Sequence, residues 1–171
     1  MDINSAAFDN MWLKIVGSFI GKIQPHKGLE FFAANRNKFE VWMKVELCET
    51  LANPSNNIKP EKDRIDIVIN DNFAIELKTI NTNYRTKNVE NKIRPITKNI
   101  DSVCSDIDKL KKNGKYEIKS VMFIVFPLSL ESEKSDWVQH IDKIEQKLTK
   151  LESKEFYFSN TIRGKLYFGL I

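Results

Sequence analysis

The sequence predicts a single α/β (α+β) domain, residues 1–171, in which helices flank a mixed β-sheet. Apolar residues recur at helical spacing in four segments and follow strand-like patterns in others, and the two kinds of segment are interleaved along the chain. A length of 171 residues suits one domain with a sizeable core. The formal net charge of +4 is modest, so by itself it does not indicate a nucleic-acid partner.

An N-terminal helical extension is predicted within residues 1–28. Its apolar residues lie three or four positions apart, as in an amphipathic helix: Phe8, Met11, Trp12, Ile15, Val16, Phe19, Ile20 and Ile23. A Pro and a Gly between Gln24 and Gly28 end this helix. A second helix is expected to run from Leu29 or Asn35 to Ala52 and to stop before Asn53-Pro54.

The rest of the chain predicts strands and two further helices. Residues 64–78, RIDIVINDNFAIELK, alternate as two strands around a turn at residues 70–72. A third helix ends near Asn113-Gly114, and the apolar run at 120–126 indicates a strand buried on both faces. Two short strands at 155–159 and 166–170 close the chain. A fourth helix precedes them and carries Trp137, Ile141, Ile144, Leu148 and Leu151.

Two acids and a lysine interrupt the apolar strand pattern at Asp66, Glu76 and Lys78. In a hairpin with a three-residue turn, Ile69 pairs with Phe73, which places Asp66 opposite Glu76, with Lys78 next on the same face. Like charges directly opposite each other destabilise a sheet by about 0.2–1 kcal/mol. A bound hard divalent cation such as Mg²⁺ would explain why two acids face each other, because Mg²⁺ is typically bound by one or two carboxylates and several waters.

Lys78 would then orient or deprotonate an attacking water, or stabilise charge on a phosphate. The tripeptide Glu-x-Lys is unspecific, since it occurs at four other places, but only the copy at 76–78 lies in a strand pattern. The alternative interpretation is the polar, solvent-facing side of an edge hairpin.

Asp66, nine intervening residues and Glu76-Leu77-Lys78 resemble the motif of the PD-(D/E)XK nuclease superfamily. The resemblance covers residues 35–126, about half of the chain, in the order helix, Asp strand, Glu-x-Lys strand, helix, strand. Ile65 stands where the family name has Pro. The resemblance implies a restriction-endonuclease-like core and Mg²⁺- or Mn²⁺-dependent hydrolysis of phosphodiester bonds. Asp66 and Glu76 would be the metal ligands and Lys78 an active-site amine.

Members of this superfamily often add a Glu from the preceding helix, and geometry favours Glu40 over Glu46 and Glu49 as that catalytic and metal-binding acid. At about 100° per residue, Glu40 falls within the apolar arc formed by Met43, Leu47 and Leu51. A carboxylate on that face is costly unless it is paired or bound to a metal. Lys44, on the same side, is a weaker candidate. The alternative is that Glu40 lies at the frayed start of the helix and is solvated.

A basic segment follows the motif directly. Residues 81–99 contain one acid, Glu90, and five bases, a net +4 that equals the formal charge of the whole chain: Arg85, Lys87, Lys92, Arg94 and Lys98. We expect this segment to contact the phosphate backbone of DNA, where basic residues give affinity without reading the sequence. The alternative is an ordinary solvated loop.

The leading hypothesis is therefore a metal-dependent deoxyribonuclease. A catalytically silent nucleic-acid-binding or assembly subunit on the same fold, and an RNA-processing nuclease, stay open. The sequence contains no run of about 18 apolar residues, so no membrane span is predicted. The first ten residues, MDINSAAFDN, do not resemble a signal peptide. Cys48 and Cys104 fit unpaired thiols of a cytoplasmic protein. Late aromatic residues fit the core or an oligomer interface, so a homodimer stays open: Trp137, Tyr157, Phe158, Tyr167 and Phe168.

Overall fold

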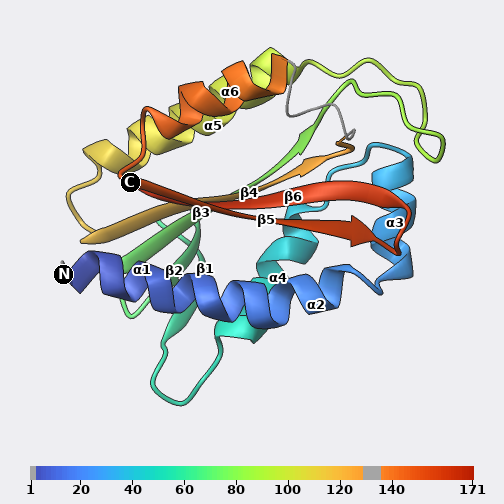
Figure 1. Ribbon diagram of the computed structural model, residues 1–171. Coiled ribbons are helices and arrows are strands. Elements are labelled where there is room, and N and C mark those ends of the chain that lie inside the picture. The colour runs from blue at the N-terminus through green and yellow to red at the C-terminus, as the bar shows by residue number, and fades with distance from the viewer. Residues whose placement is uncertain (1–2, 129–135) are drawn as a thin grey trace.

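A six-stranded mixed sheet in the order β1-β2-β3-β4-β6-β5 forms the central layer of the protein, as a computed structural model shows (Figure 1). The structure describes residues 3–128 and 136–171. Strands β3 and β4 are parallel, and every other neighbouring pair is antiparallel. The predicted α/β class with a mixed sheet is thereby confirmed. The strands are β1 (Ile58–Lys62), β2 (Ile65–Ile69), β3 (Phe73–Asn81), β4 (Ile118–Phe126), β5 (Lys150–Phe158) and β6 (Ile162–Leu170).

Helices cover both faces of the sheet. The N-terminal helix is continuous through α1 (Ile3–Lys14), a π-helical turn η1 (Ile15–Phe19) and α2 (Ile20–Ile23). In Figure 1, α5 and α6 lie on one face, whereas α1, α2 and α4 lie on the other. The remaining helices are α3 (Lys27–Ala34), α4 (Glu40–Leu51), α5 (Ile96–Lys112) and α6 (Asp136–Glu145). Within the described parts of the chain, no helix is both long and apolar enough to cross a membrane.

Each face of the sheet has its own apolar core. On one face, Phe19 of the N-terminal helix and Met43 and Leu47 of α4 share a core with Ile75 and Leu77 of β3. On the other face, apolar residues of α5 and α6 pack on β4. All residues of β4 except Lys119 are buried, so the predicted strand buried on both faces is confirmed. Most of the late aromatic residues belong to these cores: Trp137, Phe158, Tyr167 and Phe168 are buried, whereas Tyr157 is 40% exposed.

Of the two starts predicted for the second helix, Leu29 is wrong, because a separate helix, α3, occupies that stretch; α4 lies within the alternative that starts at Asn35, and it ends at Leu51, before Asn53-Pro54 as predicted. Helix α3 ends at Ala34, and Arg36 adopts a positive φ of 55° two residues later. A left-handed residue just beyond the last turn is the usual way to end a helix, but glycine normally occupies it. Here an arginine does, and Glu40 begins α4 after a short turn.

Two further boundaries differ from the prediction. Strand β1, IKPEK, was not expected, because its few apolar residues give no alternation; Pro and Lys are typical of such an edge strand. The fourth helix ends at Glu145. Leu151 instead belongs to β5, opposite Gly169 on β6, and Leu148 packs against the same glycine, so their helical spacing is coincidental. As a result β5 and β6 are longer than the predicted closing strands.

The register of the hairpin between β2 and β3 is confirmed. Ile69 pairs with Phe73, Val68 with Ala74 and Ile67 with Ile75. The turn between β1 and β2 consists of Asp63 and Arg64, both at positive φ, as a two-residue hairpin turn of type I′ requires.

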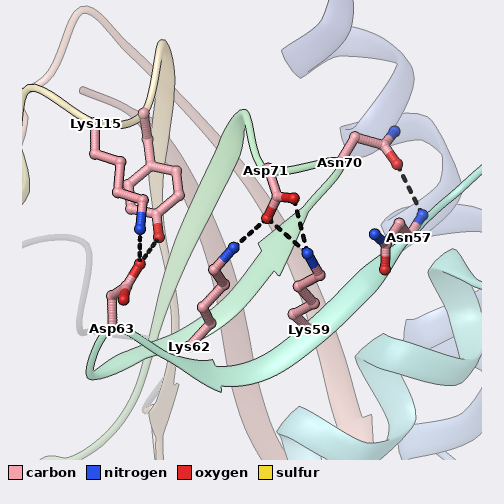
Figure 2. A network of polar contacts seen from close by, with 8 residues as sticks. Asn57, Lys59, Lys62, Asp63, Asn70, Asp71 and Lys115 are labelled. Carbon is pink, nitrogen blue, oxygen red and sulfur yellow. Dashed lines mark hydrogen bonds and ion pairs between the residues drawn. The ribbon is translucent and has the colours of Figure 1, made fainter.

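Polar contacts fix both turns, as Figure 2 shows. Asp71 accepts hydrogen bonds from Lys59, at 2.7 Å, and from Lys62. These two hydrogen bonds lower the pKa of Asp71 to about 2. Lys115 Nζ lies 2.6 Å from Asp63 Oδ2. The network holds the ends of the two strands that carry Asp66 and Glu76.

Candidate active site

Asp66 lies where the backbone pairing of β2 with β3 stops. The backbone ladder ends at the pair Ile67 and Ile75. Beyond it, the Asp66 side chain provides the next hydrogen bond between the strands, because its Oδ2 accepts the N–H of Leu77 at 2.9 Å. Its other oxygen, Oδ1, lies 2.7 Å from Lys44 Nζ on α4, and Lys44 also bonds Glu61. Asp66 thus joins a strand on one side to a helix on the other, with its side chain 20% exposed.

The carboxyl group of Glu76 on β3 lies close enough to that of Asp66 for the two to interact, as the hairpin count predicts. Burial, then the hydrogen bond with Asp66 and the charges of Asp66 and Asp106, raise the pKa of Glu76 to about 8; the charge of Lys78 opposes this rise. A carboxyl group with such a pKa mostly keeps its proton at neutral pH. The two acids therefore lie close enough that only one of them is comfortably ionised.

Lys78 points to the α5 side of the sheet, where its Nζ lies 2.8 Å from Asp106 Oδ2. Burial alone would lower the pKa of Lys78, but the hydrogen bond with Asp106 and the charges of Asp106, Glu40 and Glu76 outweigh it, so the pKa is raised. An amine in this state is a stable ammonium ion. Of the roles expected for Lys78, the structure therefore favours stabilising a phosphate's charge over deprotonating water.

Asp106 is a site residue that the sequence reasoning missed. Its side chain is only 10% exposed, and it bonds Lys109 as well as Lys78. Burial raises the pKa of Asp106, but the hydrogen bonds from the two lysines lower it by more. A signal was present, since Asp106 occupies the apolar face of α5 between Val103 and Leu110. The helical count that singled out Glu40 would have found it.

Glu40 is the first residue of α4, and its carboxylate faces β3. Its Oε1 accepts the N–H of Thr79 at 2.9 Å and the Thr79 hydroxyl at 3.2 Å, and it lies 3.7 Å from Lys38 Nζ. The helix phase inferred from the sequence is therefore confirmed. Glu46, by contrast, bonds Lys22 of α2 at 3.0 Å. Glu40 does begin its helix, as the alternative held, but it is held by the sheet rather than merely solvated.

The residues present fit a divalent cation as a two-carboxylate site. Among residues 3–128 and 136–171, no three His, Cys, Asp or Glu side chains form a group ready to bind a metal. Asp66 and Glu76 interact closely enough that burial and the Asp66 carboxylate raise the pKa of Glu76, and a bound cation would offset the repulsion between the two acids once both are ionised. Mg²⁺ is commonly held by one or two carboxylates with waters completing its shell. Glu40 as a third ligand stays a prediction, because it bonds Thr79.

Most of the basic segment forms the long green loop between β3 and α5 in Figure 1, and its last residues, 96–99, form the first turn of α5. Arg85, Lys87 and Lys98 are exposed, and Lys92 pairs with Glu90 at 2.5 Å. Arg94 is half-buried, because its guanidinium donates a hydrogen bond of 2.9 Å to the Arg36 carbonyl. The loop is therefore not uniformly solvated, and Arg94 has a structural contact that the sequence did not reveal.

Arg36 holds the same loop in place through hydrogen bonds to its backbone. It is 1% exposed, and its guanidinium donates to the carbonyls of Tyr84 and Glu90 at 2.7 Å each and to that of Thr82. Buried guanidinium groups need such partners. These bonds explain why an arginine occupies the strained position after α3, and they hold the basic segment against the start of α4.

Comparison with protein-family models, curated proteins and solved structures finds no match to the chain. The case for a function therefore depends on the chemistry of the site itself.

Proposed function

We propose that the protein is a divalent-metal-dependent nuclease that hydrolyses DNA phosphodiester bonds, as an endonuclease of the restriction, defence or DNA-processing type. The observation that carries this proposal is the contact between Asp66 and Glu76, with Lys78 two residues along the same strand. The element order α4, β2, β3, α5, β4 supports it, because it follows the order expected for a PD-(D/E)XK core, with β1 added before the Asp strand.

Each residue then has a role that its surroundings support. Asp66 and Glu76 would hold Mg²⁺ or Mn²⁺, which when bound supplies Lewis-acid stabilisation of a phosphate and acidifies a water. Lys78, kept as an ammonium ion by Asp106, would stabilise negative charge on the reacting phosphate. Glu40 would complete the site from α4. The exposed bases of residues 81–99 would bind the DNA backbone. A cytoplasmic location is part of the proposal, and the free Cys48 and Cys104 fit it.

One observation favours a second candidate, a catalytically silent nucleic-acid-binding or assembly subunit. Lys44 already pairs with Asp66, and Asp106 already pairs with Lys78. A network whose charges are mutually satisfied can serve structure alone. The two candidates differ in whether a divalent cation displaces this pairing and cleavage follows.

Cleavage assays separate the candidates. Supercoiled plasmid, linear duplex, single-stranded DNA and RNA would each be incubated with Mg²⁺ or Mn²⁺, with EDTA as the metal-free control. We expect metal-dependent DNA cleavage that is lost in Asp66→Asn and Glu76→Gln but retained in Glu46→Gln, which alters the α4 acid that pairs with Lys22 of α2. Binding of DNA without cleavage by any form would favour the silent subunit, and preferential cleavage of RNA would change the substrate class.

A further inference from the structure

A small hollow beside the candidate active site has a lining suited to an anion. Its volume is about 280 Å³, and it lies between the turn that joins α3 to α4, the end of β3 and the start of α5. Among the described residues that line it, none is acidic. Its polar lining consists of three cationic and three amide side chains: Arg36, Lys38, Arg94, Asn37, Asn81 and Asn99.

Two buried polar atoms in this lining lack partners. Asn81 is 2% exposed, and its amide oxygen has no hydrogen-bond partner among the described residues. The Nε atom of Arg94 is also buried and has no hydrogen-bond partner among the described residues, although another nitrogen of that guanidinium donates to the Arg36 carbonyl. Buried polar groups are usually satisfied. A ligand that brings an acceptor for Arg94 and a hydroxyl or bound water for Asn81 would satisfy both.

Among the described residues no carboxylate lines the hollow; Glu40, just outside it, contacts Lys38 at 3.7 Å, and Arg36 and Arg94 have no carboxylate partner on the wall. The Arg36 guanidinium bonds backbone carbonyls, which leave its net charge in place. Burial, followed by the charge of Arg94, lowers the pKa of Arg36, and the charge of Glu90 opposes this shift. The N-terminus of α5 adds its helix dipole. Pro95 offers no side-chain cap there, and the first turn of this fully described helix contains no acid.

The hollow adjoins the residues assigned to catalysis. Asn81 follows Thr79, the partner of Glu40, by two positions on β3, so both side chains lie on one face of the strand. Lys38 Nζ lies 3.7 Å from Glu40 Oε1. We propose that the hollow is a phosphate-binding subsite in which Lys38 and Arg94, with the N-terminus of α5, hold a phosphate of the nucleic-acid strand next to the one to be cut, while a bound water donates to the Asn81 oxygen. The assignment to a nucleic-acid strand rests on the proposed function, whereas phosphate binding does not.

Inorganic phosphate is the first probe, used on the full chain in EDTA so that cleavage plays no part. Melting temperatures would be followed against phosphate concentration, with chloride at matched ionic strength. We expect a saturable rise that chloride does not reproduce. Lys38→Gln, whose side chain is 51% exposed, should weaken the apparent phosphate affinity at least fivefold. Lys111→Gln removes the same charge from the exposed far end of α5 and should leave the affinity unchanged.

Arg94→Lys is a second variant, which keeps the charge but removes Nε, and it should also weaken phosphate binding. The proposal is overturned if phosphate acts no differently from chloride, or if neither variant weakens its effect. Retention of the wild-type circular dichroism spectrum by Lys38→Gln excludes misfolding as the cause of a loss.

Oligonucleotides then identify the source of the phosphate. Binding of 5′-phosphorylated and 5′-hydroxyl strands would be compared by fluorescence anisotropy in EDTA. Tighter binding of the phosphorylated strand, lost in Lys38→Gln, assigns the subsite to a strand end. Equal binding that Lys38→Gln weakens in both, with a salt slope smaller by about 0.7 for a single strand, assigns it to an internal phosphodiester. If the protein cleaves DNA but Lys38→Gln and Arg94→Lys alter neither phosphate nor oligonucleotide binding, the subsite is refuted and the nuclease proposal stands. If phosphate binds and DNA does not, the nuclease proposal fails and the anion site remains.

Discussion

Replacing Glu76 by Gln tests the contact on which the functional proposal depends. Gln keeps the size of the side chain and can donate a hydrogen bond to Asp66, much as the protonated acid does. It cannot ionise. The substitution therefore removes a carboxyl group whose pKa burial and Asp66 raise to about 8, and it does so without opening a cavity.

The sign of the expected effect follows from proton linkage. Because the pKa of Glu76 is higher in the native state than in the unfolded chain, the native state holds a proton that the unfolded chain has already released between about pH 4.5 and 8. The free energy of unfolding therefore falls as the pH rises through that window. One pKa unit corresponds to about 1.4 kcal/mol. Taking half of the shift, because the pair is partly solvated, the native state loses about 2 kcal/mol by pH 9.

Urea denaturation in EDTA at pH 5, 7 and 9 measures this loss. We expect the wild type to lose about 2 kcal/mol more than Glu76→Gln over this range, and the variant to be the more stable of the two at pH 9. Glu46→Gln, which alters a carboxyl group paired with Lys22, should follow the wild type. Parallel pH profiles for the wild type and Glu76→Gln would refute the strained pair, and with it the argument for a cation at this site.

Three other substitutions test separate parts of the site. Glu40→Gln should reduce metal-dependent cleavage more than Glu46→Gln, measured as initial rates on plasmid DNA; equal rates would remove Glu40 from the site. Asp106→Asn leaves the half-buried Lys78 without its counter-charge, so urea denaturation should show a loss of about 1–2 kcal/mol, and cleavage should fall at saturating Mg²⁺. An unchanged rate would show that Lys78 acts without Asp106. Replacing the exposed bases of the basic segment, Arg85 and Lys87 of the loop and Lys98 of α5, with Ser should reduce the slope of log K against log salt by about 0.9 per lost contact with duplex DNA. An unchanged slope would make the segment an ordinary solvated one.

The strand pair and its register could be predicted because both depend on local rules. A period of two places Asp66 and Glu76 on fixed faces, and a three-residue turn fixes which residues pair. The meeting of the two acids follows from these rules, although the backbone ladder stops one pair short of them. The orientation of Glu40 was predictable for the same reason, since it depends only on the helical period.

Features that depend on distant contacts could not be predicted in this way. The break after α3 depends on Arg36, whose strained backbone is held by carbonyls of a loop far along the chain. The position of Arg94 depends on that same anchoring. A helical count would have placed Asp106 on the apolar face of α5, but only the packing of α5 against the sheet shows that Lys78 is its partner.

Lys44 distinguishes a catalytic site from a structural network. Its ammonium group, 14% exposed, lies 2.7 Å from Asp66 Oδ1, so a divalent cation bound by Asp66 and Glu76 would approach an oxygen that a positive charge already contacts. Two cations at one carboxylate repel each other. Lys44→Gln should therefore tighten Mg²⁺ binding, measured by calorimetry or by the Mg²⁺-induced rise in melting temperature. The loss of a partly buried ion pair should cost the metal-free protein about 1 kcal/mol. A variant that is destabilised and shows no metal response, beside a wild type that shows none either, would identify these charges as a structural network.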